Sequence, residues 1–414
     1  MAVSKQEWRG ALGAVLAAKA AALLILYAGW FYLPAADWGI DSWMTRTGVS
    51  FVDNLANFDG AWYVRLAMIG PRRLAGGDYD LAAATSELRV MDRLGYEQGL
   101  WPPTAGRFDR GYGYRHWPLF PGLIRAAAAL GPDPVYAAVI LSNLFTVAYG
   151  LLLYLLVRKD LGHAPALFCL ALAQFHPGAY ALSAAYNESL FLAFAVGAML
   201  CARNRRWWVC GLLTLGAVLT RVCAVVIVLP LLYEWLAERE GASPLSRAGL
   251  RAGLRGLGDR PGIWWTLSIP LGGALLLYYF YWASGDALIF TRVHEGNVYG
   301  HINWPWLMLK ATYDKGPVTW MKELPLHALL LATIVATWGR LRWSYWLWLA
   351  VFFLYHTSNG NHSYLRYQAQ CWPLFFALAL LLERRPGWQG VALGLSAGLF
   401  GLFGAMFING YWVA

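Results

Sequence analysis

Long apolar runs, separated by short polar segments, follow one another along most of the 414-residue chain. A run of about 20 apolar residues can cross the hydrocarbon core of a bilayer as a helix, and interfacial Trp or Tyr can extend shorter runs. The pattern therefore predicts an all-α polytopic membrane protein. The predicted spans are 10–33, 134–157, 164–182, 188–202, 207–219, 222–237, 262–283, 323–338, 343–356, 368–382 and 388–410.

A further apolar stretch, 117–131, is short and contains Pro118, Pro121 and Arg125. Short loops rich in basic residues face the cytoplasm, and this rule decides whether the stretch crosses the membrane. If it does not cross, 16 Lys and Arg lie in the short cytoplasmic segments against 6 in the short outer loops. We therefore predict about eleven spans, with the N-terminus inside, the C-terminus outside and 117–131 half inserted.

No soluble repeat or low-complexity linker divides the chain, so residues 1–414 are expected to form one membrane domain. The largest soluble segment is the first extracytoplasmic loop, 34–116, with a helix-like run over 49–69 and a second half rich in Gly and Pro. The first apolar run is too long for the core of a signal peptide, and we interpret it as a retained span.

Composition supports lipid as the main solvent. Hydrophobic residues make up 59% of the chain and charged residues only 14%, against about 25% charged in soluble domains. Arg at the ends of apolar runs accounts for the net charge of +10, so a nucleic-acid partner is not expected. The five cysteines lie in or beside apolar stretches without metal-ligand spacing, which is typical of small core residues.

Acid, amide, His and Arg side chains gather on the side predicted to face outward, which indicates an extracytoplasmic active site. Glu188 and Arg221 lie at the ends of apolar segments, where ionisable groups usually face a cavity or a partner. They could form a structural ion pair. Alternatively, Arg221 or Arg366 could bind a phosphate, because a planar guanidinium donates to two oxygens at once.

Asp59 is surrounded by aromatic residues, which can lower local polarity and tune the basicity of its carboxylate. A lone loop aspartate is more commonly a turn or cap residue. The Asp78-Tyr79-Asp80 triplet could hold a divalent metal on a sugar nucleotide, but it follows two glycines and is more typical of a surface turn. His294 and His301 are further apart than paired metal ligands usually are, so no metal site is predicted.

Five segments, in order, resemble the motifs of the GPI mannosyltransferase 2-like family, the relatives of the enzyme that adds the second mannose of GPI anchors. They are FDGAWYVRLA at 58–67, WPLFP at 117–121, LSAAYNESLF at 182–191, RWW at 206–208 with LTR at 219–221, and YLRY at 364–367. Phe58 stands where the family usually has Trp, Val222 where Pro often follows, and the stretch between Asp59 and Trp117 is long. These departures affect the expected identity of the acceptor more than the expected type of reaction.

The resemblance implies the GT-C fold and transfer of a sugar, most commonly mannose, from a polyprenyl or dolichyl phosphate with inversion. By this resemblance Asp59 would be the general base, and Arg221 and Arg366 would bind the donor phosphate. The sugar or acceptor would contact the remaining candidate residues, which are His116, Tyr186, Asn187, Glu188 and His362. No cofactor or metal is implied.

The expected partners are the lipid-linked donor, the bilayer and a glycan, glycolipid or protein acceptor. Two other interpretations stay open. A lipid or sugar transporter would show paired repeats with broken helices, and no convincing repeat is present. A catalytically inactive partner subunit would tolerate substitution of Asp59. The Ala/Arg/Gly-rich composition and short loops favour a prokaryotic plasma membrane over the endoplasmic reticulum.

Overall fold

The computed structural model describes residues 4–36, 50–72, 113–237, 262–291, 303–314, 317–358 and 363–413. Within these ranges every regular element is helical and no strand occurs, which confirms the all-α prediction for the described residues. The longer helices are α1 (Lys5–Tyr32), α3 (Asp59–Ile69), α7 (Leu119–Ala128), α8 (Pro134–Leu161), α9 (His163–Gln174), α10 (Glu188–Arg203), α11 (Trp207–Thr220), α12 (Val228–Leu236), α14 (Ser268–Ser284), α16 (Pro305–Asp314), α17 (Pro317–Ala336), α18 (Trp343–Ser358), α20 (Trp372–Leu382) and α21 (Pro386–Ile408). The short ones are α2 (Phe51–Asn54), η2 (Gly113–Arg115), η3 (Ala179–Leu182), η4 (Val222–Ile227), η5 (Ile263–Leu267) and α19 (Tyr364–Gln368).

Among the described residues, three helices are long and apolar enough to cross a membrane, namely α1, α8 and α21. The other predicted spans coincide with helices that are shorter, less apolar or joined to 3-10 turns. The apolar helices thus indicate a membrane protein. The count of about eleven spans stays a prediction.

Local sequence explains where the first long helices begin. Ser4 caps α1 because its side-chain oxygen accepts a hydrogen bond from the Glu7 amide, while the Glu7 carboxylate accepts one from the Ser4 amide. At α8, the Asp133 side chain accepts from the Val135 amide, and Pro134 occupies the first turn, where its missing N–H has no helical partner to lose.

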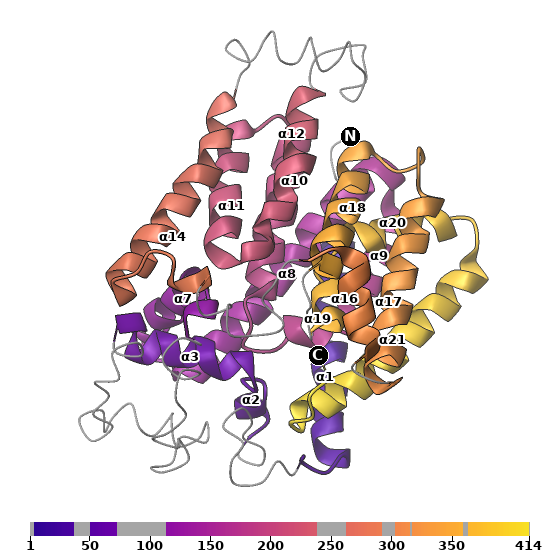
Figure 1. Ribbon diagram of the computed structural model, residues 1–414. Helices are drawn as coiled ribbons and strands as arrows, with labels where there is room; N and C mark the ends of the chain where they lie inside the picture. Colours follow the sequence, from indigo (N-terminus) through magenta and orange to yellow (C-terminus); the bar gives the residue numbers. More distant parts are fainter. Residues whose placement is uncertain are drawn as a thin grey trace.

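A bundle around α10 forms the centre of the protein. Helix α10 packs closely against both α8 and α11, α8 also packs against α9, and α1 packs against α21. Figure 1 shows α10, α11, α12 and α14 side by side, with α17, α18, α20 and α21 forming a second group across the bundle. The two chain termini lie toward opposite ends of the molecule (Figure 1).

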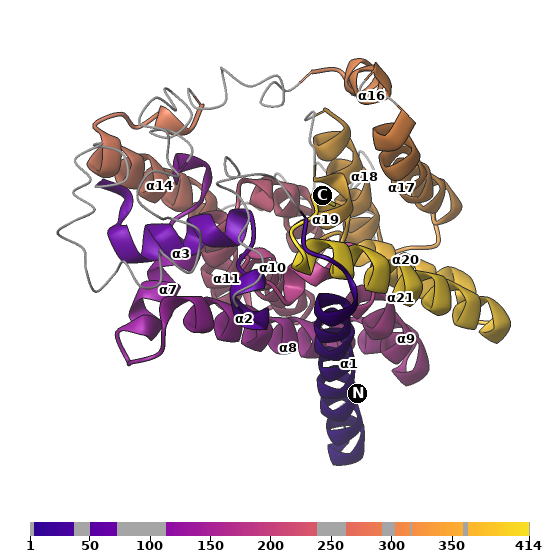
Figure 2. The same cartoon turned by 90° about the horizontal axis from the view of Figure 1, so that it is seen from below.

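At one end of the bundle α3 and α7 run across the other helices, as the view from below shows (Figure 2). Each packs against the other and against α8. Helix α7 spans ten residues, hence about 15 Å, which is half the thickness of a bilayer core. That length suits the predicted half-inserted segment 117–131, whose depth in a membrane stays a prediction.

The predicted span 164–182 is not one continuous helix. Helix α9 ends at Gln174, and after Pro177 the chain continues through η3 into a buried, irregular connection to α10. A Cβ on Gly178 would lie 2.1 Å from the carbonyl oxygen of Leu365, so only glycine permits the two segments to approach this closely. This contact brings the chain before Glu188 beside the chain before Arg366.

Candidate active site

Asp59 is the first residue of α3, and the residue before it has an unusual backbone. Phe58 has φ 55°, a conformation that non-glycine residues rarely adopt and that often accompanies functional sites. The Phe58 ring is held between Phe407 and Trp412, with centroid distances of 6.0 and 5.0 Å. Packing against the end of α21 therefore fixes the backbone that presents Asp59.

The side chain of Asp59 meets one guanidinium and one imidazole. Its Oδ2 lies 2.7 Å from Arg366 Nη1, and its Oδ1 lies 3.8 Å from His116 Nε2. Asp59 keeps 20% of its side chain exposed, whereas Arg366 and His116 each keep 5%. Burial raises the pKa of Asp59, but the charge of Arg366 and the nearby His116 outweigh it and hold the pKa well below its ordinary value.

Glu188 connects this pair to a second arginine. Its Oε1 lies 3.3 Å from Arg366 Nε and 2.9 Å from Arg221 Nη1, and the side chain is 1% exposed. Glu188 is the first residue of α10, where the helix dipole also favours a negative charge. The neighbouring Asn187 accepts a hydrogen bond from Arg221 and donates one of 2.8 Å to the Thr220 carbonyl.

Two tyrosines flank the arginines. The Arg366 guanidinium carbon lies 5.0 Å from the ring centres of both Tyr186 and Tyr367, and that of Arg221 lies 5.4 Å from Tyr367. Such cation–π contacts hold guanidiniums in place without neutralising them. The Tyr186 hydroxyl donates to the Asn57 carbonyl at 3.1 Å, which ties this wall to the loop before α3.

We call this group the Asp59 cluster: Asp59, His116, Tyr186, Asn187, Glu188, Arg221, Arg366 and Tyr367. It brings together every candidate residue from the sequence except His362, which lies outside the described residues. Asp78, Asp80, His294 and His301 also lie outside them. Glu188 and Arg221 form the ion pair that was one of the two alternatives predicted from the sequence. Arg366 lies beside the carboxylates of both Asp59 and Glu188, so the two arginines are found at the same place.

Among the described residues, no group of three or more His, Cys, Asp and Glu side chains is placed to hold a metal ion. The Asp59 cluster instead pairs two carboxylates with two guanidiniums. A partly exposed carboxylate can accept a proton, and adjacent buried guanidiniums can stabilise an anion. The arrangement can therefore support displacement of an anionic leaving group by a nucleophile that loses a proton.

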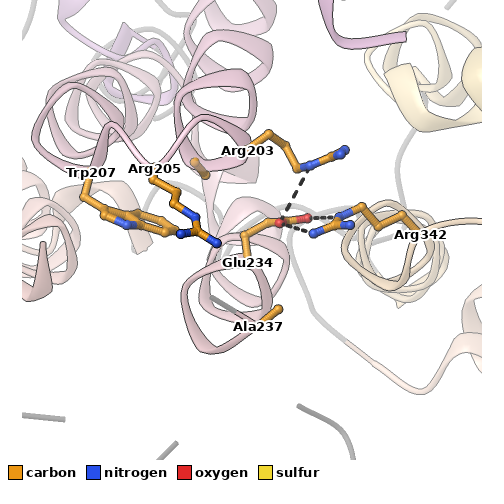
Figure 3. Close-up of a pocket in the computed structure, with 7 residues that line it drawn as sticks. Arg203, Arg205, Trp207, Glu234, Ala237 and Arg342 are labelled. Atoms are coloured by element: carbon orange, nitrogen blue, oxygen red, sulfur yellow. Dashed lines mark hydrogen bonds and ion pairs between the residues drawn. The ribbon is translucent and has the colours of Figure 1, made fainter. Parts of the chain in front are cut away.

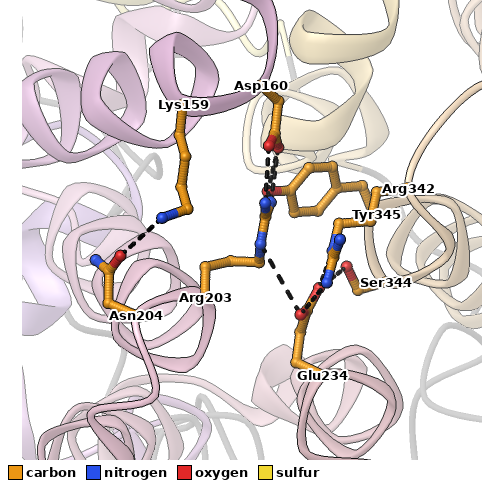
Figure 4. Close-up of polar contacts among 8 residues, drawn as sticks. All are labelled: Lys159, Asp160, Arg203, Asn204, Glu234, Arg342, Ser344 and Tyr345. Atoms are coloured by element: carbon orange, nitrogen blue, oxygen red, sulfur yellow. Dashed lines mark hydrogen bonds and ion pairs between the residues drawn. The ribbon is translucent and has the colours of Figure 1, made fainter. Parts of the chain in front are cut away.

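A second polar network lies at the other end of α10, about 22 Å away by helix length. Asp160, at the end of α8, accepts hydrogen bonds of 2.6 and 2.7 Å from Arg203 and one of 2.9 Å from the Tyr345 hydroxyl. Glu234 of α12 accepts bonds of 2.6 and 2.7 Å from Arg342 (Figure 4). We call these five residues, with Ser344, the Asp160 cluster.

A cavity of about 160 Å³ adjoins the Asp160 cluster and is lined by Ala202, Arg203, Arg205, Trp207, Glu234, Ala237 and Arg342 (Figure 3). It lies at the opposite end of α10 from Asp59. Because Arg203 is already paired with Asp160 and Arg342 with Glu234, the cavity has no evident part in the chemistry of the Asp59 cluster.

Sequence reasoning did not single out Tyr367 or the Asp160 cluster. Tyr367 follows Arg366 in the YLRY segment at 364–367. An aromatic residue next to a buried arginine could have indicated a cation–π contact. The arginines of the Asp160 cluster were explained by topology alone. Their carboxylate partners come from α8 and α12, which no short-range pattern connects.

One comparison with known proteins gives a match. Residues 115–251 match the family model of dolichyl-phosphate-mannose-protein mannosyltransferases. The matched segment includes His116, Glu188 and Arg221, while Asp59 and Arg366 lie outside it. No curated protein matches the chain. The matched segment covers about a third of the chain, and over that segment the chain is similar to glycosyltransferases that transfer mannose from dolichyl phosphate.

Proposed function

We propose that this protein transfers mannose from a polyprenyl or dolichyl phosphate to an acceptor hydroxyl, with inversion at the anomeric carbon. The observation that carries the proposal is the position of the Asp59 carboxylate. It lies 2.7 Å from Arg366, and Glu188 contacts both Arg366 and Arg221. In this proposal the base and the phosphate site lie side by side.

In the proposed step the acceptor oxygen attacks the anomeric carbon while Asp59 takes the hydroxyl proton. The bond between the anomeric carbon and the phosphate oxygen breaks, and its electron pair leaves with the lipid phosphate. A well-placed general base contributes roughly 10²–10⁴-fold to such a reaction. Asp59 suits this role because it is the partly exposed carboxylate of the pair, whereas Glu188 is buried.

Arg221 and Arg366 would bind the donor phosphate and stabilise the charge that develops on it. Their present partners are carboxylates, which a phosphate can replace because it offers the same planar oxygen pairs to a guanidinium. When Arg366 turns toward the phosphate, its charge is shared, and the pKa of Asp59 rises toward a value better suited to accepting a proton.

Asn187, Glu188, His116 and Tyr186 would contact the sugar or acceptor, or hold the arginines in place, and His362 belongs to the same proposed group. A fold of the GT-C type with about eleven spans would place the Asp59 cluster on the extracytoplasmic side. Cysteines introduced for Leu130 and Arg384, both exposed, should then react with impermeant reagents from opposite sides. Labelling from the same side would reject this topology.

A GPI mannosyltransferase 2-like subfamily and a prokaryotic plasma membrane remain our proposals for the subfamily and location. In this proposal the acceptor is a glycan, a glycolipid or a protein. A transporter or an inactive partner subunit would instead show no sugar transfer at all.

The decisive experiment uses the purified full chain in lipid nanodiscs with EDTA present. Radiolabelled polyprenyl-phosphate mannose and a panel of hydroxyl acceptors are supplied to the wild-type protein, Asp59→Asn and Asp53→Asn. Asp53 is the control because it is a buried aspartate outside the Asp59 cluster, and its carboxylate accepts a 2.6 Å hydrogen bond from the hydroxyl of Ser50, the N-cap of α2. Transfer by the wild type and Asp53→Asn, but not by Asp59→Asn, is expected. Equal transfer by all three would exclude Asp59 as the base.

A further inference from the structure

His356, in the last turns of α18, is a buried histidine without hydrogen bonds. It is 5% exposed, and neither ring nitrogen has a hydrogen-bond partner in the structure. An imidazole always carries at least one N–H, and buried polar groups are nearly always paired with protein, water or ligand. A buried imidazole with both nitrogens unpaired therefore points to a group that the protein binds.

Two other buried histidines show what ordinary pairing looks like here. His176 has one ring nitrogen 3.2 Å from Gln368 Oε1, and the other accepts a 3.1 Å bond from the Gly178 amide. His327 has Nδ1 2.9 Å from the Glu323 carbonyl. Burial alone thus does not leave a histidine unpaired in this protein.

The surroundings of His356 indicate the chemistry of a ligand that it could bind. Its ring stacks on Tyr367 at 5.2 Å with an interplanar angle of 25°. Tyr367 also accepts a 3.2 Å hydrogen bond from Arg366 and lies under the guanidinium of Arg221. His356 therefore adjoins both arginines through one shared aromatic wall.

Neighbouring polar atoms show a similar lack of pairing. Tyr364 is 1% exposed, and its ring centre lies 6.3 Å from that of His356. At the arginines themselves, Arg366 Nε and both oxygens of Glu188 also lack a hydrogen bond of good geometry. Unpaired polar atoms thus occur beside the guanidiniums, as expected for a site that binds a polar anion, although they also occur elsewhere in the described residues.

We propose that His356 is a donor-binding residue, whose ring N–H donates to a non-bridging oxygen of the lipid phosphate held by Arg221 and Arg366. This inference rests on the proposed function. A neutral imidazole adds a directed donor without adding charge, which suits a place already next to two cations. Tyr367 fixes the plane of the ring by stacking.

The test compares the wild-type protein, His356→Phe and His327→Phe, each purified as the full chain in nanodiscs. Phenylalanine keeps a ring that can stack on Tyr367 and removes only the nitrogens. The control, His327, stacks at 3.7 Å on Tyr364 and bonds a backbone carbonyl, so it reports on aromatic packing in the same region. The probes are polyprenyl phosphate and polyprenyl-phosphate mannose.

We expect His356→Phe to bind both lipids about tenfold more weakly or worse, the effect of one hydrogen bond to a charged group. Its thermal stability should be kept or raised, because an unpaired buried polar group has been removed. KM for the donor should rise more than kcat falls. His327→Phe should bind both lipids as the wild type does.

Three results would overturn the assignment. Unchanged binding of both lipids by His356→Phe would remove it from the site. Weaker binding of the mannosylated lipid alone would place it at the sugar and not at the phosphate. Equal weakening in His327→Phe would attribute the effect to packing. Each of these leaves the proposed function intact, whereas failure of the wild type to bind either lipid would overturn the proposed function and this inference together.

Discussion

Carboxylates and arginines alternate at both ends of α10, but the two networks are built differently. In the Asp160 cluster each carboxylate receives two hydrogen bonds from one guanidinium, and the hydroxyls of Tyr345 and Ser344 add further bonds. The network connects α8, α10, α12 and α18 (Figure 4). Saturated pairs of this kind hold helices together and leave little capacity for another partner.

The Asp59 cluster has the same residue types in a less saturated arrangement. Glu188 lies within ion-pair distance of two arginines, yet neither of its oxygens forms a hydrogen bond of good geometry. Asp59 meets Arg366 through a single oxygen. The difference teaches that residue type does not separate a structural network from a candidate site. What distinguishes these two networks is the number of hydrogen bonds that their buried carboxylates and guanidiniums leave unmade.

The largest expected effect is a difference in turnover between variants of Asp59 and Asp160. Asp59→Asn should lower turnover by roughly 10²–10⁴-fold while leaving the fold unchanged, because an amide cannot take the acceptor proton. Asp160→Asn should keep most of the turnover of correctly folded protein. Single-turnover transfer from polyprenyl-phosphate mannose measures both. A similar loss of turnover in the two variants would remove the distinction between the clusters.

Variants of the arginines in the two clusters should differ in their affinity for the lipid phosphate, with a smaller effect than the difference in turnover. Arg221→Gln and Arg366→Gln should each weaken binding of polyprenyl phosphate about 10–100-fold, the effect of hydrogen bonds to a charged group. Arg203→Gln is the matched control because its partners, Asp160 and Glu234, lie at the far end of α10. Titration of nanodisc-embedded protein with the lipid gives the affinities. If Arg203→Gln weakens binding as much, the phosphate site has been misplaced.

Stability should respond most at the Asp160 cluster. Glu234→Gln removes the charge that Arg342 and Arg203 share, and it should destabilise the protein by about 2–4 kcal/mol, at the lower end of that range because Arg342 is 39% exposed. Lys310→Gln breaks the exposed pair with Asp314 and should change stability by about 0.5 kcal/mol or less. Thermal unfolding in detergent measures both. Equal midpoints for the two variants would argue against a structural role for the Asp160 cluster.

The smallest effect is a shift in pH dependence. In the wild type, the low pKa of Asp59 keeps the base ionised as pH falls toward its ordinary value. Arg366→Gln leaves the effect of burial unopposed, so the pKa of Asp59 rises and more of the base is protonated at a given acidic pH. The acidic limb of the residual kcat/KM profile should therefore move to higher pH.

Arg221→Gln serves as the control for that shift, since Arg221 contacts Glu188 and not Asp59. Its acidic limb should move less than that of Arg366→Gln. Identical profiles for the wild type and Arg366→Gln would show that another group controls the acidic limb.

The sequence by itself determined the helical class, because long apolar runs in lipid can satisfy their backbone hydrogen bonds only within helices or closed barrels. Short motifs also identified most members of the Asp59 cluster. Glu188 and Arg221 stand at the ends of apolar runs, where a charged side chain needs a partner or a cavity.

Only the tertiary structure decided which of these residues are partners. Asp59 and Arg366 are separated by 307 positions, and their contact depends on the close approach of Gly178 to Leu365, which no local pattern encodes. The unpaired state of His356 is equally invisible in sequence, because a missing hydrogen bond is a property of every surrounding element at once. Local periodicity decides which residues are helical, whereas packing between distant segments decides which polar groups remain available to bind a ligand.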